Sequence, residues 1–169
     1  MKTLMKTLFL FIMVSAGITS AKAQDSTKQI AKADAVKTMI NAVNYVFKAD
    51  FANPLRGGNK QLTTEYDLTV TKDTIVAFLP YYGRAYVGSL DPNEGGIKFT
   101  STSFDYKVTE GKKGGWDITI KPKDTNVNKM SSVQLLRLSI SSGGYATLSV
   151  TSTNRDPISF SGEIETGKK

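Results

Sequence analysis

The sequence predicts a mainly β protein, in which an antiparallel meander curls into a barrel or a sandwich, lipocalin-like in outline, with one N-terminal α-helix. Two observations predict this fold class. After about residue 45, apolar and polar residues alternate in roughly nine or ten short runs that turn-forming residues separate. Before them, one segment repeats its apolar residues every three or four positions, as a helix does. A sheet of so many strands usually closes on itself or folds into two layers.

Residues 1–23 have the three-part layout of a signal peptide. Two lysines precede an apolar run at 8–14, and small residues lead to the Ala-Lys-Ala sequence at 21–23. The uncharged stretch 7–21 is shorter than the roughly 20 apolar residues that a bilayer core requires. We therefore expect cleavage after residue 23, no stable membrane anchor, and a single exported domain of residues 24–169 in the periplasm or outside the cell.

The predicted helix covers about residues 28–45. Asp25 or Ser26 could cap its first turn. Its polar side should face water, so we expect its apolar stripe to lie across an end or a face of the β structure. The stripe consists of Ile30, Ala33, Val36, Met39, Ile40, Val43 and Phe47.

The first strands follow directly. Alternation in 45–51 places residues 45, 47, 49 and 51 on one face, and 53–59 reads as a loop because of its proline and glycines. Residues 62–70 and 75–79 alternate on either side of Thr71-Lys72-Asp73, which predicts a hairpin.

The later strands follow the same pattern. Residues 97–108 alternate up to a glycine-rich tip at 110–115, after which Trp116, Ile118 and Ile120 share one face, so we expect Trp116 to be buried. In 133–140 the apolar parity shifts between Leu135 and Leu136, which suggests a β-bulge or a strand covered on both faces. Turns at 141–144 and 154–157 lead into the final two strands.

The composition excludes much of the usual catalytic chemistry. The chain has no histidine and no cysteine, which removes histidine bases, thiolate nucleophiles and the common zinc, haem and iron–sulfur ligand sets. Asp105, Asp117, Glu163 and Glu165 alternate with apolar residues, which favours solvent-facing positions over a paired-acid site. We expect no enzyme, cofactor or metal, and a paired-carboxylate enzyme is a distant third hypothesis.

The charge balance also argues against nucleic-acid binding. Residues 1–23 hold three lysines and no acid, so their removal lowers the formal net charge from +7 to +4. The remaining basic residues, such as Lys112 and Lys113, fall in turns and at the terminus rather than along an aromatic-lined stripe. We expect no nucleic-acid partner, and the oligomeric state stays open.

Two segments could carry binding. Tyr81, Tyr82 and Arg84 surround a proline and a glycine at the end of a predicted strand, where they form either a structural corner or the rim of a recognition surface. Asn154 and Arg155, in the turn before the last strand, are the second candidate, although turn geometry alone accounts for the asparagine.

These observations leave two functions open. The first is a non-enzymatic binding protein that holds a small apolar or amphipathic molecule in a β pocket. A pocket lined by large aromatic side chains would favour it: Phe78, Phe99, Phe104, Trp116 and Tyr82. The second is a protein–protein interaction module of the bacterial envelope, which a filled core with exposed Tyr81 and Tyr86 would favour.

Three stretches and two single residues resemble the exported domain-of-unknown-function family numbered 4251, found in Bacteroidota. The stretches are 79–85 (Leu-Pro-Tyr-Tyr-Gly-Arg-Ala), 95–99 (Gly-Gly-Ile-Lys-Phe) and 144–155, followed by Ile158 and Gly162. The resemblance extends from about residue 36 to residue 164. It implies a Gram-negative envelope setting and brings no activity, substrate, cofactor or catalytic residue.

Overall fold

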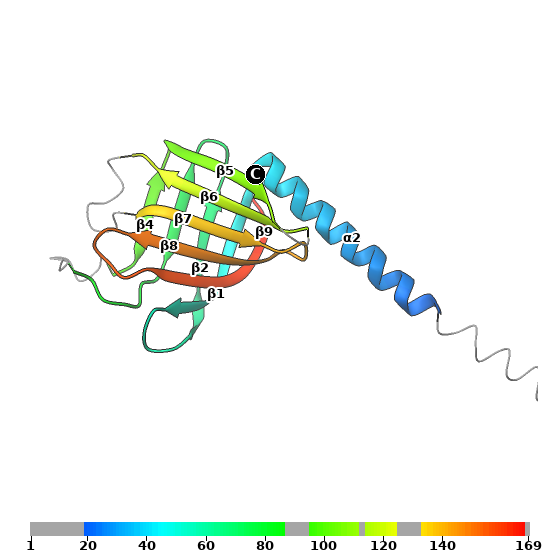
Figure 1. The fold of residues 1–169 in the computed structure, drawn as a ribbon, viewed down its shortest axis with the longest axis horizontal. Coiled ribbons are helices and arrows are strands. Elements are labelled where there is room, and N and C mark those ends of the chain that lie inside the picture. Colours follow the sequence, from blue (N-terminus) through cyan, green and yellow to red (C-terminus); the bar gives the residue numbers. More distant parts are fainter. Residues whose placement is uncertain (1–18, 87–94, 112–113, 125–132, 168–169) are drawn as a thin grey trace, which may run out of the picture.

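A computed structural model describes residues 19–86, 95–111, 114–124 and 133–167. It confirms a mainly β fold, in which nine antiparallel strands form one nearly closed, barrel-like sheet, in the order β4-β3-β2-β1-β9-β8-β7-β6-β5 (Figure 1). The strands are β1 (Tyr45–Pro54), β2 (Lys60–Val70), β3 (Ile75–Leu79), β4 (Ile97–Ser101), β5 (Phe104–Glu110), β6 (Trp116–Pro122), β7 (Val133–Ile140), β8 (Tyr145–Ser152) and β9 (Ile158–Thr166).

The helix differs from its predicted bounds at both ends. Helix α2 (Thr19–Ala42) already includes Asp25 and Ser26, so neither residue caps its first turn. It ends before residue 45 because Val43 adopts a left-handed conformation, with φ at 48°. The amide of Val43 donates to the Ile40 carbonyl and that of Asn44 to the Met39 carbonyl, both at 3.1 Å. This pair of bonds is a Schellman motif, which satisfies the last carbonyls and releases the chain into β1.

Only the last turns of α2 pack on the barrel. Val36 and Ile40 are buried, whereas Ile30 is 63% exposed, so the apolar stripe meets the β structure at one end of the barrel with its C-terminal part only. Figure 1 shows the rest of the helix projecting away from one end of the barrel. No helix in the described part of the chain is long and apolar enough to cross a membrane.

Strand β1 lies between β2 and β9, the central strand of the sheet, and contains a bulge that overturns one prediction. Its register with β9 shifts between Ala49 and Phe51, because Asp50 is an extra residue in the ladder. Phe51 therefore points outward and is 43% exposed, not inward with Tyr45. Opposite the bulge, a Cβ at Gly162 would overlap the Lys48 carbonyl oxygen, so this close approach requires glycine.

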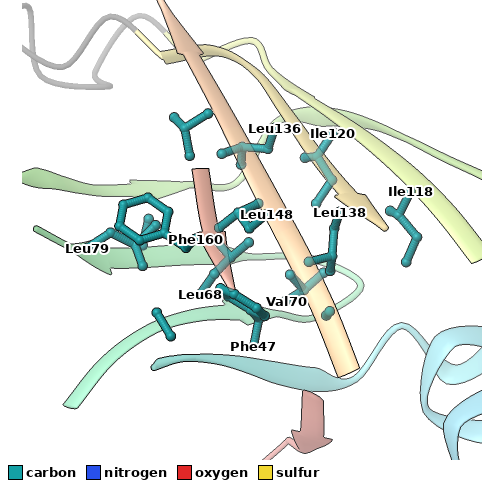
Figure 2. Packing of buried hydrophobic residues seen from close by; sticks show 14 of the residues in the cluster. Phe47, Leu68, Val70, Leu79, Ile118, Ile120, Leu136, Leu138, Leu148 and Phe160 are labelled. Atoms are coloured by element: carbon teal, nitrogen blue, oxygen red, sulfur yellow. The ribbon is translucent and has the colours of Figure 1, made fainter. Parts of the chain in front are cut away.

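The interior of the barrel is filled by apolar side chains that converge from opposite walls (Figure 2). Trp116 is buried, as predicted, and it shares its inward face with Ile118 and Ile120. The parity shift in β7 is a bulge, because its register with β8 shifts between Val133 and Leu135. The fully buried part of this core includes Phe47, Leu68, Leu79, Leu136, Leu138, Leu148 and Phe160.

The edge strands β4 and β5 are consecutive in the chain, and a short corner at Thr102 and Ser103 joins them. Asp124 holds this corner, because its Oδ2 accepts hydrogen bonds from the Thr102 amide at 2.6 Å and the Ser103 amide at 3.2 Å. These bonds lower the pKa of Asp124 below its ordinary value. Inside the barrel, the Tyr45 hydroxyl of β1 lies 3.2 Å from that of Tyr106 of β5.

Candidate functional site

The structure brings the two predicted binding segments together in one place, which we call the tyrosine corner (Pro80–Tyr86, Gly96 and Asn154–Asp156). Pro80 ends β3, as expected of a residue that cannot continue a ladder. Ala85 then forms an antiparallel bridge with Arg155. The Tyr86 amide donates to the Asn154 carbonyl at 2.8 Å, and the Asp156 amide donates to the Arg84 carbonyl at 3.0 Å.

Arg155 is the buried centre of the tyrosine corner. Its side chain is only 7% exposed, and Nη1 donates to the Gly96 carbonyl at 2.8 Å. Its Cζ lies 4.9 Å from the centroid of the Tyr81 ring, which is a cation–π distance. Arg155 therefore joins the ends of β3 and β4 to the β8–β9 turn.

The Tyr81 hydroxyl completes this network. It donates to the Arg84 carbonyl at 2.8 Å and lies 3.2 Å from the Asp156 carbonyl. Burial, with the nearby Asp156 carboxylate as a second cause, raises the pKa of Tyr81 above its ordinary value. Because the groups of Tyr81 and Arg155 are engaged with the chain itself, both residues act in the structure of the corner.

The other predicted residues lie nearer the surface. Arg84 is exposed, and Asn154 and Tyr82 are half-buried. Lys60 Nζ of β2 lies 5.7 Å from the centroid of the Tyr82 ring. The exposed Tyr86 donates its hydroxyl hydrogen bond to Asp156 Oδ1, and this bond is the first cause that raises the pKa of Tyr86. Arg84 and Tyr86 thus form the accessible rim of the corner.

A second site lies on the outer face of the barrel. A cavity of about 820 Å³, which we call the outer groove, crosses five neighbouring strands. Their register places one outward residue of each strand in a single row. In the order of the strands β1, β9, β8, β7 and β6, the row is Phe51, Ser161, Thr147, Ser139 and Asp117.

The outer groove combines hydroxyl, carboxylate and aromatic groups. Ser139 Oγ donates to Asp117 Oδ1 at 2.7 Å, which fixes that carboxylate in the row. At the β1 side the bulge places Asp50 and Phe51 on the outer face together. Tyr145, 63% exposed, lines the groove beside the β7–β8 turn, and Lys32 Nζ of α2 lies 5.3 Å from its ring centroid.

The floor of the outer groove is the wall of the sheet, whose inward side chains belong to the core. Trp116, Ile140 and Ala146 line the groove and are also buried among the core residues. Close backbone packing supports one end, since a Cβ on Gly115 would lie 2.6 Å from the Ile140 carbonyl oxygen. The exposed row therefore rests on a rigid, packed base, which favours a preformed site.

The groove geometry does not resemble an acid–base active site. Its two carboxylates, Asp50 and Asp117, stand on β1 and β6, four strand spacings apart, which is about 19 Å along the sheet. Paired-acid glycoside hydrolysis needs carboxyl groups within roughly 5–9.5 Å. Among the described residues there is also no group of three or more acidic side chains placed to hold a metal ion.

Sequence reasoning located the tyrosine corner but missed the outer groove. The row consists of ordinary outward strand positions, which look like solvated surface when each strand is read alone. The one available signal was the pair Asp50 and Phe51, because it breaks the alternation of β1 once Ala52 is counted as inward. The cross-strand register that assembles the row is not visible in a single sequence.

Comparisons with known proteins agree on the family and give no activity. The family model "Domain of unknown function (DUF4251)" matches residues 27–164. The fold is similar to the crystal structure of a DUF4251 family protein from Bacteroides eggerthii, with a TM-score of 0.62 and 20% sequence identity over 82% of this chain and 91% of that chain. No curated protein matches the chain.

Proposed function

We propose that this chain, which belongs to the DUF4251 family, is an exported, non-enzymatic binding protein that holds a small amphipathic molecule in the outer groove. The observation that carries the proposal is the cavity of about 820 Å³, which joins exposed aromatic rings to a row of hydroxyls on a packed floor. Pockets of roughly 300–1,000 Å³ are typical of small-molecule sites. The signal-peptide layout of residues 1–23 supports a periplasmic or secreted location.

The packing of the barrel explains why the ligand belongs outside it. Phe99 and Trp116 are buried in the core rather than lining an open interior pocket, and Phe78 is 40% exposed on the outer face. A ligand inside the barrel would have to displace well-packed core side chains, at a cost in stability. The outer groove offers volume without that displacement.

Native mass spectrometry of the protein purified from its own envelope tests the proposal. We expect a retained small-molecule adduct on the wild type and its loss in Thr147→Trp, which fills the middle of the groove. Thr100→Trp is the matched control, because Thr100 is an exposed residue on the outer face of β4. Absence of any adduct, or an adduct that survives Thr147→Trp, would contradict the proposal.

The second candidate function is a protein–protein interaction module that uses the rim of the tyrosine corner. The specific observation is that Arg84 and Tyr86 are exposed above a network that holds their backbone rigidly. Aromatic and arginine side chains of this kind are common at recognition surfaces. In this case a polypeptide should co-purify from the envelope, Arg84→Ala should release it without lowering the melting temperature, and Thr147→Trp should retain it.

A further inference from the structure

The hydroxyl groups of the outer groove favour a ligand that both donates and accepts hydrogen bonds. Ser139 and Ser141 already donate within the chain and Ser161 already accepts from Asn53, so Thr147 and the remaining positions of these three serines are what a ligand would meet. Five of the lining residues carry a hydroxyl on a serine or threonine side chain. A hydroxyl offers one donor and two acceptor positions. An ammonium group only donates and a carboxylate only accepts, so either would leave part of this row unused, whereas an alcohol group matches it on both counts. The five residues are Ser139, Ser141, Ser142, Thr147 and Ser161.

The charges of the groove further restrict the class of ligand that it can bind. Among the lining residues that the structure describes, the charged ones are Asp50 and Asp117. Next to the row, Glu163 lies opposite Tyr145 in the β8–β9 register, on the same outer face. Lysines stand beside the groove, since Lys48 pairs with Glu163 in the β1–β9 register and Lys32 lies over Tyr145. The two carboxylates inside the groove would nevertheless repel an anionic ligand that contacts the row. Asp117 already accepts a hydrogen bond from Ser139, which leaves further acceptor positions for neutral donors.

The aromatic rings supply an apolar surface near two parts of the groove. Phe51 stands at the β1 end of the row, and Tyr145 lies beside its middle on β8. Both rings are exposed, at 43% and 63%. A pyranose ring has one face made of C–H groups and a rim of hydroxyls, so it can place the first on an aromatic ring and the second on the row.

The length of the groove argues against a single sugar ring as its ligand, and its direction across the strands argues against an extended peptide. The row crosses five strands, about 19 Å at the usual strand spacing, which exceeds a single sugar ring. An extended peptide binds a sheet by adding a strand at an edge. Here the backbone groups of β9, β8 and β7 are already paired on both sides, so a peptide crossing them would find no free ladder.

We infer that the ligand of the outer groove is a linear, neutral oligosaccharide, which lies across the strands with sugar rings against Phe51 and Tyr145 and with its hydroxyls on the Ser161–Thr147–Ser139–Asp117 row. The inference rests on the proposed function, because it names the ligand class of the same groove. The two acidic residues alone would also attract a basic peptide. The inference nevertheless commits to a glycan, because a peptide crossing these strands would find no free backbone groups.

Calorimetric titration and backbone NMR of the exported protein test the inference. The probes are cellohexaose, chitohexaose and maltohexaose, with glucose, hexalysine and hexagalacturonate for comparison. We expect at least one neutral hexasaccharide to bind and to shift the amide signals of the row, with glucose at least tenfold weaker. Hexagalacturonate should not bind. Absence of binding by all three hexasaccharides, or shifts confined to other surfaces, would overturn the inference, as would groove binding by hexalysine alone.

Three variants sharpen this test. Removal of the Asp117 carboxylate in Asp117→Asn should weaken the bound hexasaccharide by roughly tenfold or more, as expected for a hydrogen bond to a charged group. Phe51→Ala should weaken it several-fold. Val76→Ala, an exposed apolar residue on the outer face of β3, is the matched control and should leave binding unchanged. Equal affinities in all three variants would place the sugar elsewhere.

The two proposals fail in different ways. If the envelope-purified protein retains a groove-bound adduct whose fragments contain no sugar, the oligosaccharide inference is wrong and the binding function stands. If no adduct is retained and no hexasaccharide binds, both are wrong.

Discussion

The tyrosine corner and the outer groove use similar residue types in opposite ways. In the corner, Tyr81 and Arg155 direct their polar groups at carbonyl oxygens of the same chain. In the groove, Thr147 and Tyr145 present theirs at an exposed surface above a buried floor. The comparison teaches that an unusual cluster of aromatic and cationic residues can be fully occupied by the fold. A binding surface can meanwhile be assembled from plain strand positions that only the register brings together.

The largest expected effect tests whether the wall beneath the groove is well packed. Trp116→Ala removes a large core side chain from the inner side of the wall that carries the groove, and we expect it to lower the free energy of unfolding by about 3–5 kcal/mol. Urea unfolding followed by circular dichroism measures this change. A loss below 1 kcal/mol would show that the floor is not packed as described.

A second test concerns the internal hydrogen bond of Arg155 in the tyrosine corner. Arg155→Met keeps much of the side-chain volume but leaves the buried Gly96 carbonyl without its donor, so it should cost about 1.5–3 kcal/mol of unfolding free energy. Arg155→Lys is the control, since it keeps a cation near the Tyr81 ring. If Arg155→Met is as stable as the wild type, the corner is not held by this arginine.

Alkaline pH should separate the two regions. The pKa of Tyr81 is raised in the folded protein above the ordinary value of 10.0. Its contribution to stability is therefore fully present below pH 10 and is lost as the pH rises through the higher, folded pKa. Urea unfolding between pH 8 and 11 should show a steeper loss for the wild type than for Tyr81→Phe. Thr147→Val, which removes a hydroxyl from the groove row and changes no titratable group, should follow the wild type, and parallel curves for all three proteins would contradict the assignment.

The smallest expected effect belongs to the groove row itself. Thr147→Val keeps the shape and the β-branch of an exposed side chain, so the free energy of unfolding should change by no more than about 0.5 kcal/mol. Its effect should appear in ligand retention by native mass spectrometry instead. A large destabilisation would show that the hydroxyl row serves the fold, as Arg155 does.

Much of the fold could be predicted because strand alternation reports which face is buried. The inward positions of Trp116, Ile118 and Ile120 followed from parity, and parity offered the bulge of β7 as one of two alternatives. The end of α2 did not, because a left-handed valine carries no sequence signature like that of glycine. The outward position of Phe51 did not either, because a single inserted residue in β1 reverses the face of everything after it.

The candidate sites show the same division. Tyr81 and Arg155 are in contact although they are 74 positions apart in the sequence. Each lies in a segment with turn-forming residues, so the sequence could mark both as candidates but could not predict their contact. The groove row depends on four strand registers at once. Each register is fixed by turn lengths and by packing against the opposite wall, neither of which a local pattern contains.

The place of β9 between β1 and β8 also governs how the chain can fold. Strands β1 to β4 form one local meander and β5 to β8 another, and β9 joins the two, with Tyr45 pairing with Thr166. Such a long-range closure is slow, because the loop entropy must be lost before the contacts form. A chain still lacking its last strand has two half-sheets with open edges. If the chain is exported as proposed, the barrel can be completed only after the C-terminal strand has crossed the membrane, because β9 is the strand that joins the two half-sheets.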